Sequence, residues 1–214
     1  MNSDDIRKQI EVSLRKEEKT KQLRKELSKT FSEDEVEQKW NFIKIYISSC
    51  PKILDIVYSA SQKNNLLTVF QPVFNVIFNY WTEEYDIIPD NLGLVGLCDD
   101  AYLSLKLMQK LAEQDIPGTS SKLMNIDFII KTNATMRDLI GEPAASQLDT
   151  IIEQTFMSVS FQSILSNLLN NPTLINLINS GQWFTGGGNY TQSMEDTVRG
   201  SDVWQVAANA GYFY

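Results

Sequence analysis

Four aspartates between residues 86 and 100 are the side chains of this sequence best placed for chemistry: Asp86, Asp90, Asp99 and Asp100. Hard cations prefer several oxygen ligands, so the pattern could hold Mg²⁺ or Ca²⁺. Adjacent residues of a helix point about 100° apart, so Asp99 and Asp100 cannot face one ion without help from the loop. The alternative interpretation is that the four carboxylates form helix caps and turns.

The chain contains no histidine and two cysteines. A Ser-His-Asp triad, a Cys-His nucleophile and an imidazole zinc site are therefore excluded. Any catalysis would need carboxylates, Lys, Tyr or Cys, and the sequence predicts no catalytic residue. Cys98 precedes a predicted helix, which can activate a thiol, but without histidine we interpret it as a packed thiol. Cys50 and Cys98 are too few for a disulfide framework and are expected to be reduced.

The aspartates need a helix, a tight turn and a second helix to position them. Pro89 ends the preceding helix, and Asp90 is suited to accept hydrogen bonds from free amides of the next turn. Gly93 and Gly96 allow a compact connection. Asp99 and Asp100 then fall at the start of the second helix, where its dipole favours each carboxylate by roughly 0.3–1 kcal/mol.

This stretch resembles the YkvA-like family of unknown function over about residues 66–112. The resemblance rests on Asp86, on Ile88-Pro89-Asp90, on Gly96 and on the pair Asp99-Asp100. It implies an apolar helical hairpin and, in some members, membrane association, but no established activity. Gly93 stands where the family usually has a second proline, and nearby polar residues weaken the membrane inference.

Apolar residues recur at three- and four-residue steps along most of the chain, which predicts an all-α, irregular multi-helix bundle. A capping-box pattern at Ser32 and Glu35 predicts a helix start, and Pro51 predicts a break. The expected helices cover residues 3–30, 32–49, 53–61, 66–81, 101–113, 121–140, 143–170 and 174–178. Pro143 is expected in the first turn of its helix, and Asn171-Pro172 is expected to start the last one. We expect three parts: a charged helical arm at 1–31, a helical domain at 32–180 and a C-terminal tail at 181–214.

Charge is unevenly distributed. The net charge is −8, yet residues 1–30 carry nine Lys or Arg against six Asp or Glu. The acidic balance opposes binding to nucleic acid and to anionic lipid. The basic N-terminal helix is interpreted either as a partner-binding arm or as an amphipathic helix packed against the body. No apolar signal peptide is recognised and residues 66–81 are too interrupted for a membrane span, so we expect a cytoplasmic protein.

The tail, residues 181–214, has aromatic side chains without helical or alternating spacing. We expect these residues to contact a partner: Trp183, Phe184, Tyr190, Trp204, Tyr212, Phe213 and Tyr214. The favoured hypothesis is a non-enzymatic helical interaction or assembly module that binds a protein partner or a second copy. The alternatives are a carboxylate-based divalent-metal-binding protein or hydrolase using Mg²⁺ or Ca²⁺, and a peripheral membrane-associated protein.

Overall fold

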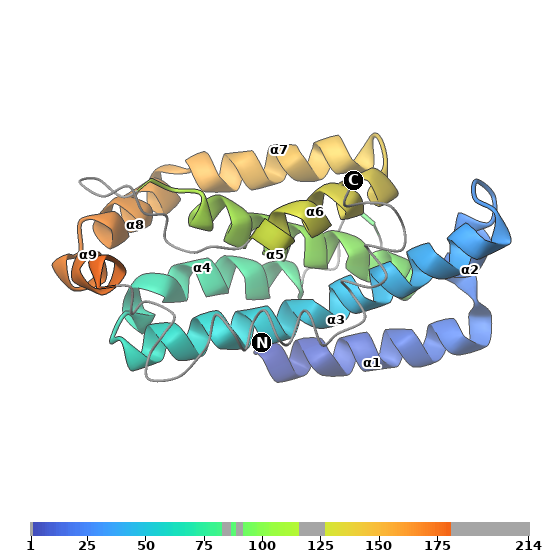
Figure 1. Cartoon of the computed structure of the whole chain (residues 1–214), viewed down its shortest axis with the longest axis horizontal. Helices are drawn as coiled ribbons and strands as arrows, with labels where there is room; N and C mark the ends of the chain where they lie inside the picture. Colours follow the sequence, from blue (N-terminus) through green and yellow to red (C-terminus); the bar gives the residue numbers. More distant parts are fainter. Residues whose placement is uncertain (1, 83–86, 89–91, 116–126, 181–214) are drawn as a thin grey trace.

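The computed structural model describes residues 2–82, 87–88, 92–115 and 127–180 (Figure 1). Within these ranges the chain forms nine α-helices and a short 3-10 helix, which confirms the all-α prediction. The helices are α1 (Ser3–Thr20), α2 (Gln22–Leu27), α3 (Glu33–Lys63), α4 (Leu67–Tyr80), η2 (Val95–Leu97), α5 (Cys98–Ala112), α6 (Asp127–Ile140), α7 (Ala144–Met157), α8 (Val159–Leu169) and α9 (Pro172–Asn179).

Helix α5 is the centre of the fold. It packs against α3 and α4 on one side and against α6 and α7 on the other (Figure 1). Thirteen of its fifteen residues are buried, Lys106 and Lys110 being the exceptions. A helix enclosed on all sides must satisfy its polar side chains inside the protein, because water cannot reach them. The polar residues of α5 therefore determine much of the internal hydrogen bonding.

The basic N-terminal segment forms two helices rather than the single helix predicted over residues 3–30. Lys21 has a φ of 51° and separates α1 from α2. Glu17, 2% exposed, accepts hydrogen bonds from the backbone amides of Leu23 at 3.0 Å and Arg24 at 3.3 Å. A carboxylate on α1 thus caps the first turn of α2, where the amides have no partner within the helix.

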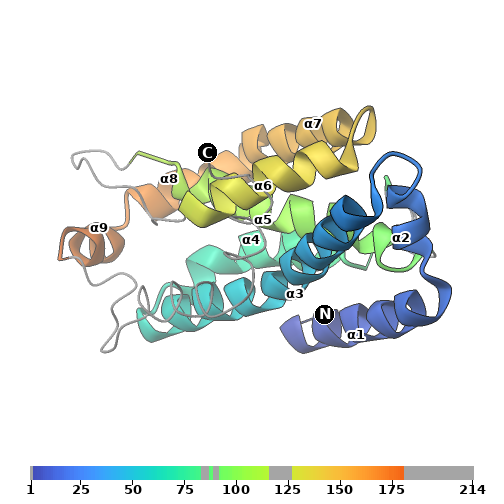
Figure 2. The ribbon, with the colours of Figure 1, turned by 45° about the vertical axis from the view of Figure 1, so that its right-hand side comes forward.

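Both N-terminal helices pack on α3. Helix α1 lies along α3 in two views and buries Ile6 and Ile10 there (Figures 1 and 2). The guanidinium of Arg24, on α2, lies 3.7 Å from the centre of the Trp40 ring and donates two 3.0 Å hydrogen bonds to the Glu37 carboxylate. Apolar and charged contacts together hold this segment against the bundle.

Helix α3 begins where the capping box predicts and continues past Pro51. The Ser32 amide donates to the Glu35 carboxylate at 2.9 Å, which confirms the predicted start. The predicted break at Pro51 is wrong, because α3 is continuous from Glu33 to Lys63. A proline inside a helix costs about 3 kcal/mol through a lost hydrogen bond and a steric clash. Burial of Ile47, Leu54 and Val57 on both sides of Pro51 outweighs that cost.

The predicted helix over residues 143–170 begins as expected after Pro143 but is divided into α7 and α8. Helix α7 ends at Met157, and Ser158, with a ψ of 144°, accepts a hydrogen bond from the Phe161 amide at 3.2 Å to start α8. A serine in extended conformation is a favourable N-cap, so the local side chain explains the break. The division lets α7 pack on α5 while α8 packs on α4.

Candidate functional site: the α5 turn, its apolar pocket and a polar seam

The turn before α5 has the compact backbone conformation that its glycines predict. Gly93 has a φ of 72°, a conformation that side chains with a Cβ rarely adopt. The Gly96 amide donates to the Gly93 carbonyl at 3.1 Å, and η2 leads directly into α5 at Cys98. A Cβ added at Gly93 would lie 3.5 Å from the side chain of Lys16, on α1. The turn is therefore packed against the N-terminal helix.

Asp99 and Asp100 both have no exposed surface. The Asp99 carboxylate accepts hydrogen bonds from the Ile88 amide at 3.0 Å and the Tyr80 hydroxyl at 3.4 Å. Asp99 therefore links the turn, the end of α4 and the start of α5. Both carboxylates also lie in the first turn of α5, where its dipole favours negative charge.

The predicted metal site is not tested by these contacts. Asp86 and Asp90 lie outside the described residues. Among the residues that are described, no three acidic or thiol side chains gather as metal ligands would. The contacts of Asp99 are those of a residue that shapes a turn. Binding of Mg²⁺ or Ca²⁺ stays a prediction from sequence.

Both thiols are buried near this turn, and burial raises their pKa values. The pKa of Cys50 rises to about 12, through burial and the nearby charge of Asp100, although a hydrogen bond with Ser104 lowers it. Burial raises the pKa of Cys98 still further, with added effects of Asp99 and Asp100. Since the thiolate is the nucleophile, these surroundings suppress cysteine chemistry.

We expect neither cysteine to react with dithionitrobenzoate in the folded protein at about pH 8, close to the ordinary thiol pKa. Both should react once guanidinium chloride unfolds the chain, because unfolding restores solvation and an ordinary pKa. Absorbance of the released thionitrobenzoate measures both results. Rapid reaction of one equivalent in the native protein would show that a thiol is activated.

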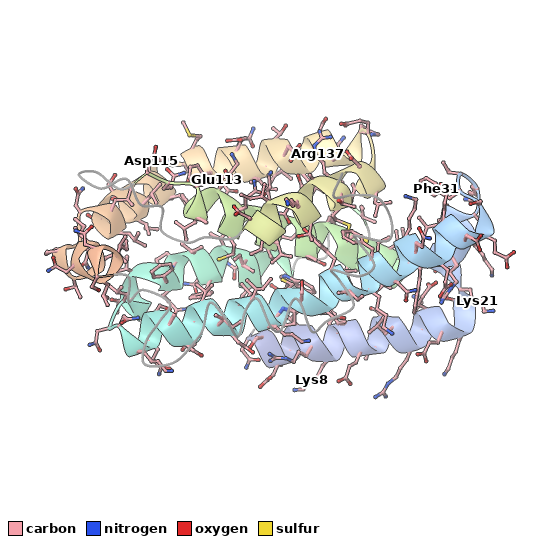
Figure 3. The ribbon with its side chains drawn as sticks, viewed as in Figure 1. Lys8, Lys21, Phe31, Glu113, Asp115 and Arg137 are labelled. Carbon is pink, nitrogen blue, oxygen red and sulfur yellow. The ribbon has the colours of Figure 1, made fainter. Side chains whose placement is uncertain are left out.

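An apolar pocket of about 200 Å³ lies between α2, the segment that joins α2 to α3, Ile43 of α3, the α5 turn and the end of α6. Its buried wall consists of Leu23, Leu27, Ile43, Cys98 and Met136. Its half-buried mouth consists of Phe31, Ile88, Val95, Leu139 and Ile140. Glu26 and Thr30 are the polar lining residues and are exposed on the rim. Figure 3 shows Phe31 and Lys21 at this end of the molecule, away from Glu113.

The size and lining of the pocket limit what it can hold. Sites for drug-sized ligands usually enclose about 300–1,000 Å³ and contain several directed polar groups. This pocket is smaller, and its polar groups are confined to the rim. It suits one large apolar side chain, of the kind that anchors a protein interface.

A network of hydrogen-bonded polar side chains, here called the polar seam, runs along α5 where it meets α6 and α7. The Tyr102 hydroxyl donates to the Asp149 carboxylate at 2.7 Å, and Arg137 donates to the same carboxylate at 2.7 Å. Arg137 also donates to Glu142 at 3.0 Å. Figure 3 shows Arg137 on α6, facing the side of the bundle where α7 lies. The seam thus joins three helices through charge-assisted hydrogen bonds.

The seam continues toward the protein interior through the side-chain amides of Asn133 and Gln109. Asn133 accepts from the Tyr46 hydroxyl at 2.6 Å and donates to Gln109 at 2.9 Å. Gln109 also accepts from the Lys106 ammonium at 3.1 Å. Burial lowers the pKa of Lys106, although nearby acids such as Glu113 oppose that effect. A lowered lysine pKa can serve catalysis, but this ammonium is engaged within the network and does not line the apolar pocket.

The Tyr102–Asp149–Arg137 contacts should make stability depend on pH. Burial raises the pKa of Asp149, but hydrogen bonds from Tyr102 and Arg137 outweigh burial and leave this pKa below its ordinary 3.8. A depressed native pKa stabilises the fold above the unfolded pKa, and this contribution is lost as pH falls through the native pKa. Asp149→Asn should therefore cost about 1 kcal/mol at neutral pH, a difference that shrinks below about pH 4.

Urea titrations at several pH values measure this difference. The matched control is Glu18→Gln, which removes an exposed acid from α1, outside the seam. If both variants lose the same stability at neutral pH, the seam contributes nothing specific.

The sequence did not indicate the pocket, because its walls come from four separate segments. The seam could have been recognised in the sequence, because polar residues recur at three- and four-residue steps along α5: Tyr102, Lys106, Gln109 and Glu113. The seven aromatic residues predicted to contact a partner, Trp183 to Tyr214, lie outside the described residues.

Comparison with known proteins does not identify the chain. No protein-family model, no curated protein and no solved structure matches it. The resemblance to the YkvA-like family therefore rests on the residues quoted above and stays a prediction. Among the described residues, none of the helices is long and apolar enough to cross a membrane.

Proposed function

We propose that this protein is a non-enzymatic helical interaction module that holds an apolar side chain of a protein partner in the α2–α3–α6 pocket. The observation that carries the proposal is the pocket itself, with an apolar wall and an exposed polar rim. Half-buried apolar residues at a pocket mouth are typical of surfaces that become covered on association.

The energetics define the kind of partner. Burying one large apolar side chain contributes about 1.5–3 kcal/mol, which corresponds by itself to weak binding. A partner must therefore surround its anchor with further contacts on the rim. Such an anchor with a polar periphery describes protein interfaces generally.

A peptide selection tests this function without knowledge of the natural partner. A random linear peptide library is selected against the wild-type protein. The Thr30→Trp variant, whose tryptophan fills the pocket mouth, is present as a competitor so that peptides binding elsewhere are removed. We expect selected peptides to share one aromatic or large aliphatic residue and to bind Thr30→Trp at least tenfold more weakly. Fluorescence anisotropy of labelled peptides measures the two affinities.

Ser28→Trp is the matched control, because Ser28 is also exposed at the end of α2 but does not line the pocket. Selected peptides should bind this control as they bind the wild type. Failure of the selection, or equal binding to both tryptophan variants, would contradict an interaction function at this pocket.

A further inference from the structure

The helices at the end of the molecule opposite the pocket carry no charged side chain. We infer that two copies of this chain associate through the exposed and half-buried residues of α8, α9 and the adjoining α4, here called the uncharged surface. Helices α9 and α2 lie at opposite ends of the molecule, so this association leaves the pocket open (Figures 1 and 2). The inference goes beyond the function proposed above and does not depend on it.

The composition of these three helices departs from that of the rest of the chain. The chain has 19 Lys or Arg and 27 Asp or Glu, yet none of them lies in α4, α8 or α9. These helices have 14, 11 and 8 residues. Globular domains average about 25% charged residues, so about eight would be expected in this length of chain. Helix α8 packs against both α4 and α9, so the uncharged helices adjoin one another.

Uncharged polar groups occupy the exposed positions, where surface helices usually carry charges. On α8 and α9 the exposed polar side chains are Ser160, Ser163, Ser166, Asn167, Thr173, Asn176 and Asn179. On the same two helices Leu169, Ile175 and Leu177 are half-buried against the core. Their remaining apolar area leaves water when a partner covers the surface, which favours association.

Charged residues of the neighbouring elements lie at the edges of this surface and carry both signs. Lys63 ends α3, just before α4 begins. Lys110 and Glu153 form an ion pair between α5 and α7. Figure 3 shows Glu113 and Asp115 on the side of the molecule where α8 lies. These charges nearly cancel, so neither sign dominates the edges of the uncharged surface.

This neutrality favours a second copy as the occupant. The chain has a net charge of −8, so two copies repel each other wherever their acidic surfaces meet. A two-fold interface brings the same patch of both copies together, so a patch of one sign would oppose itself. An uncharged patch avoids that repulsion. Hydroxyl and amide side chains contain both a donor and an acceptor, so they can pair with the same groups of another copy.

Other classes of partner suit the surface less well. Nucleic acids and anionic membranes are attracted by Lys and Arg, which α4, α8 and α9 lack. A strongly charged protein would find no opposite charge there to steer its approach. The same lack of charge does not disfavour an identical uncharged surface.

A charge-exchange experiment on the full chain tests the inference. One variant combines Ser163→Lys with Asn176→Lys, and the other combines Ser163→Glu with Asn176→Glu. Both positions are exposed, and Lys and Glu form helices at least as well as Ser and Asn, so the fold should persist. We expect the wild type to self-associate and each variant alone to associate at least tenfold more weakly, because like charges then meet. An equimolar mixture of the two variants should associate again, because opposite charges meet.

Sedimentation velocity over a range of concentrations measures the association of each sample. The matched controls place the same charges at Gln38 and Gln147, which are exposed on α3 and α7, and should associate like the wild type. A monomeric wild type, equal weakening by the controls, or a mixture that stays monomeric would each overturn the inference. Misfolded variants could not restore each other, so recovery in the mixture also excludes damage to the fold. Peptide binding at the pocket does not enter this experiment, so its outcome is separate from that of the proposed function.

Discussion

Replacing Ile6 and Ile10 together with alanine should lower the free energy of unfolding by about 4–8 kcal/mol. Both side chains are buried between α1 and α3, with exposed fractions of 0% and 4%. Each substitution removes buried apolar surface and leaves a cavity, and the two effects will not add fully because the residues are neighbours on one helix face. Domain stabilities are typically about 5–15 kcal/mol, so the double variant should be close to unfolding.

Urea unfolding followed by circular dichroism measures this loss. Val12→Ala is the control, since Val12 lies on the same helix and is 66% exposed. Its effect should stay within about 0.5 kcal/mol. If the double variant is as stable as this control, α1 behaves as an arm rather than as part of the core. The same substitutions should weaken peptide binding, because α1 carries the Glu17 cap of α2 and α2 forms one wall of the pocket.

Removing the amide of Asn133 should cost about 2–4 kcal/mol as Asn133→Ala. Asn133 is fully buried and bonds both Tyr46 and Gln109. Its loss leaves the buried Tyr46 hydroxyl without this acceptor, and water cannot replace it without entering the core. Burial holds the pKa of Tyr46 well above its ordinary value, so this hydroxyl stays a donor at neutral pH.

A double-mutant cycle separates the hydrogen bond from the packing. Tyr46→Phe should cost about 1–2 kcal/mol in the wild type and much less in Asn133→Ala, since its acceptor is then already gone. Unfolding free energies of the four proteins provide the coupling energy. Strictly additive effects would show that the two side chains are adjacent without depending on each other.

Both predictions concern the packing between helices that assembles the pocket. The pocket is assembled from α2, α3, the α5 turn and α6, and none of these segments contains it alone. The α1–α3 contact holds α2 in place, and the Asn133 network holds α6 against α5 and α3. Peptide binding should therefore be sensitive to residues that never touch a peptide.

Features controlled by neighbours in the chain were predictable. The start of α3 follows from Ser32 and Glu35, because a capping box needs side chains within one turn. The start of α9 similarly follows from Asn171 and Pro172. The tight turn before α5 follows from Gly93, whose positive φ is available to glycine at little cost.

Features controlled by residues far apart in the sequence could not be predicted. Pro51 should end a helix by local rules, but packing on both sides keeps α3 continuous. Asp99 was expected near a helix start, yet its acceptor role for Tyr80 depends on how α4 returns to α5. The pocket had no sequence signal, since its lining residues are spread from Leu23 to Ile140.

By itself, then, the sequence determined the helical class, most helix ends, the exclusion of histidine chemistry and the unequal charge of the N-terminal segment, because composition and short-range spacing suffice for these properties. The tertiary structure alone decided that α5 is enclosed, that its polar residues join α3, α6 and α7, and that an apolar pocket opens beside Cys98. The physical reason is that burial and cavity shape depend on which helix faces meet, and that choice minimises exposed apolar surface over the whole chain rather than within any one segment.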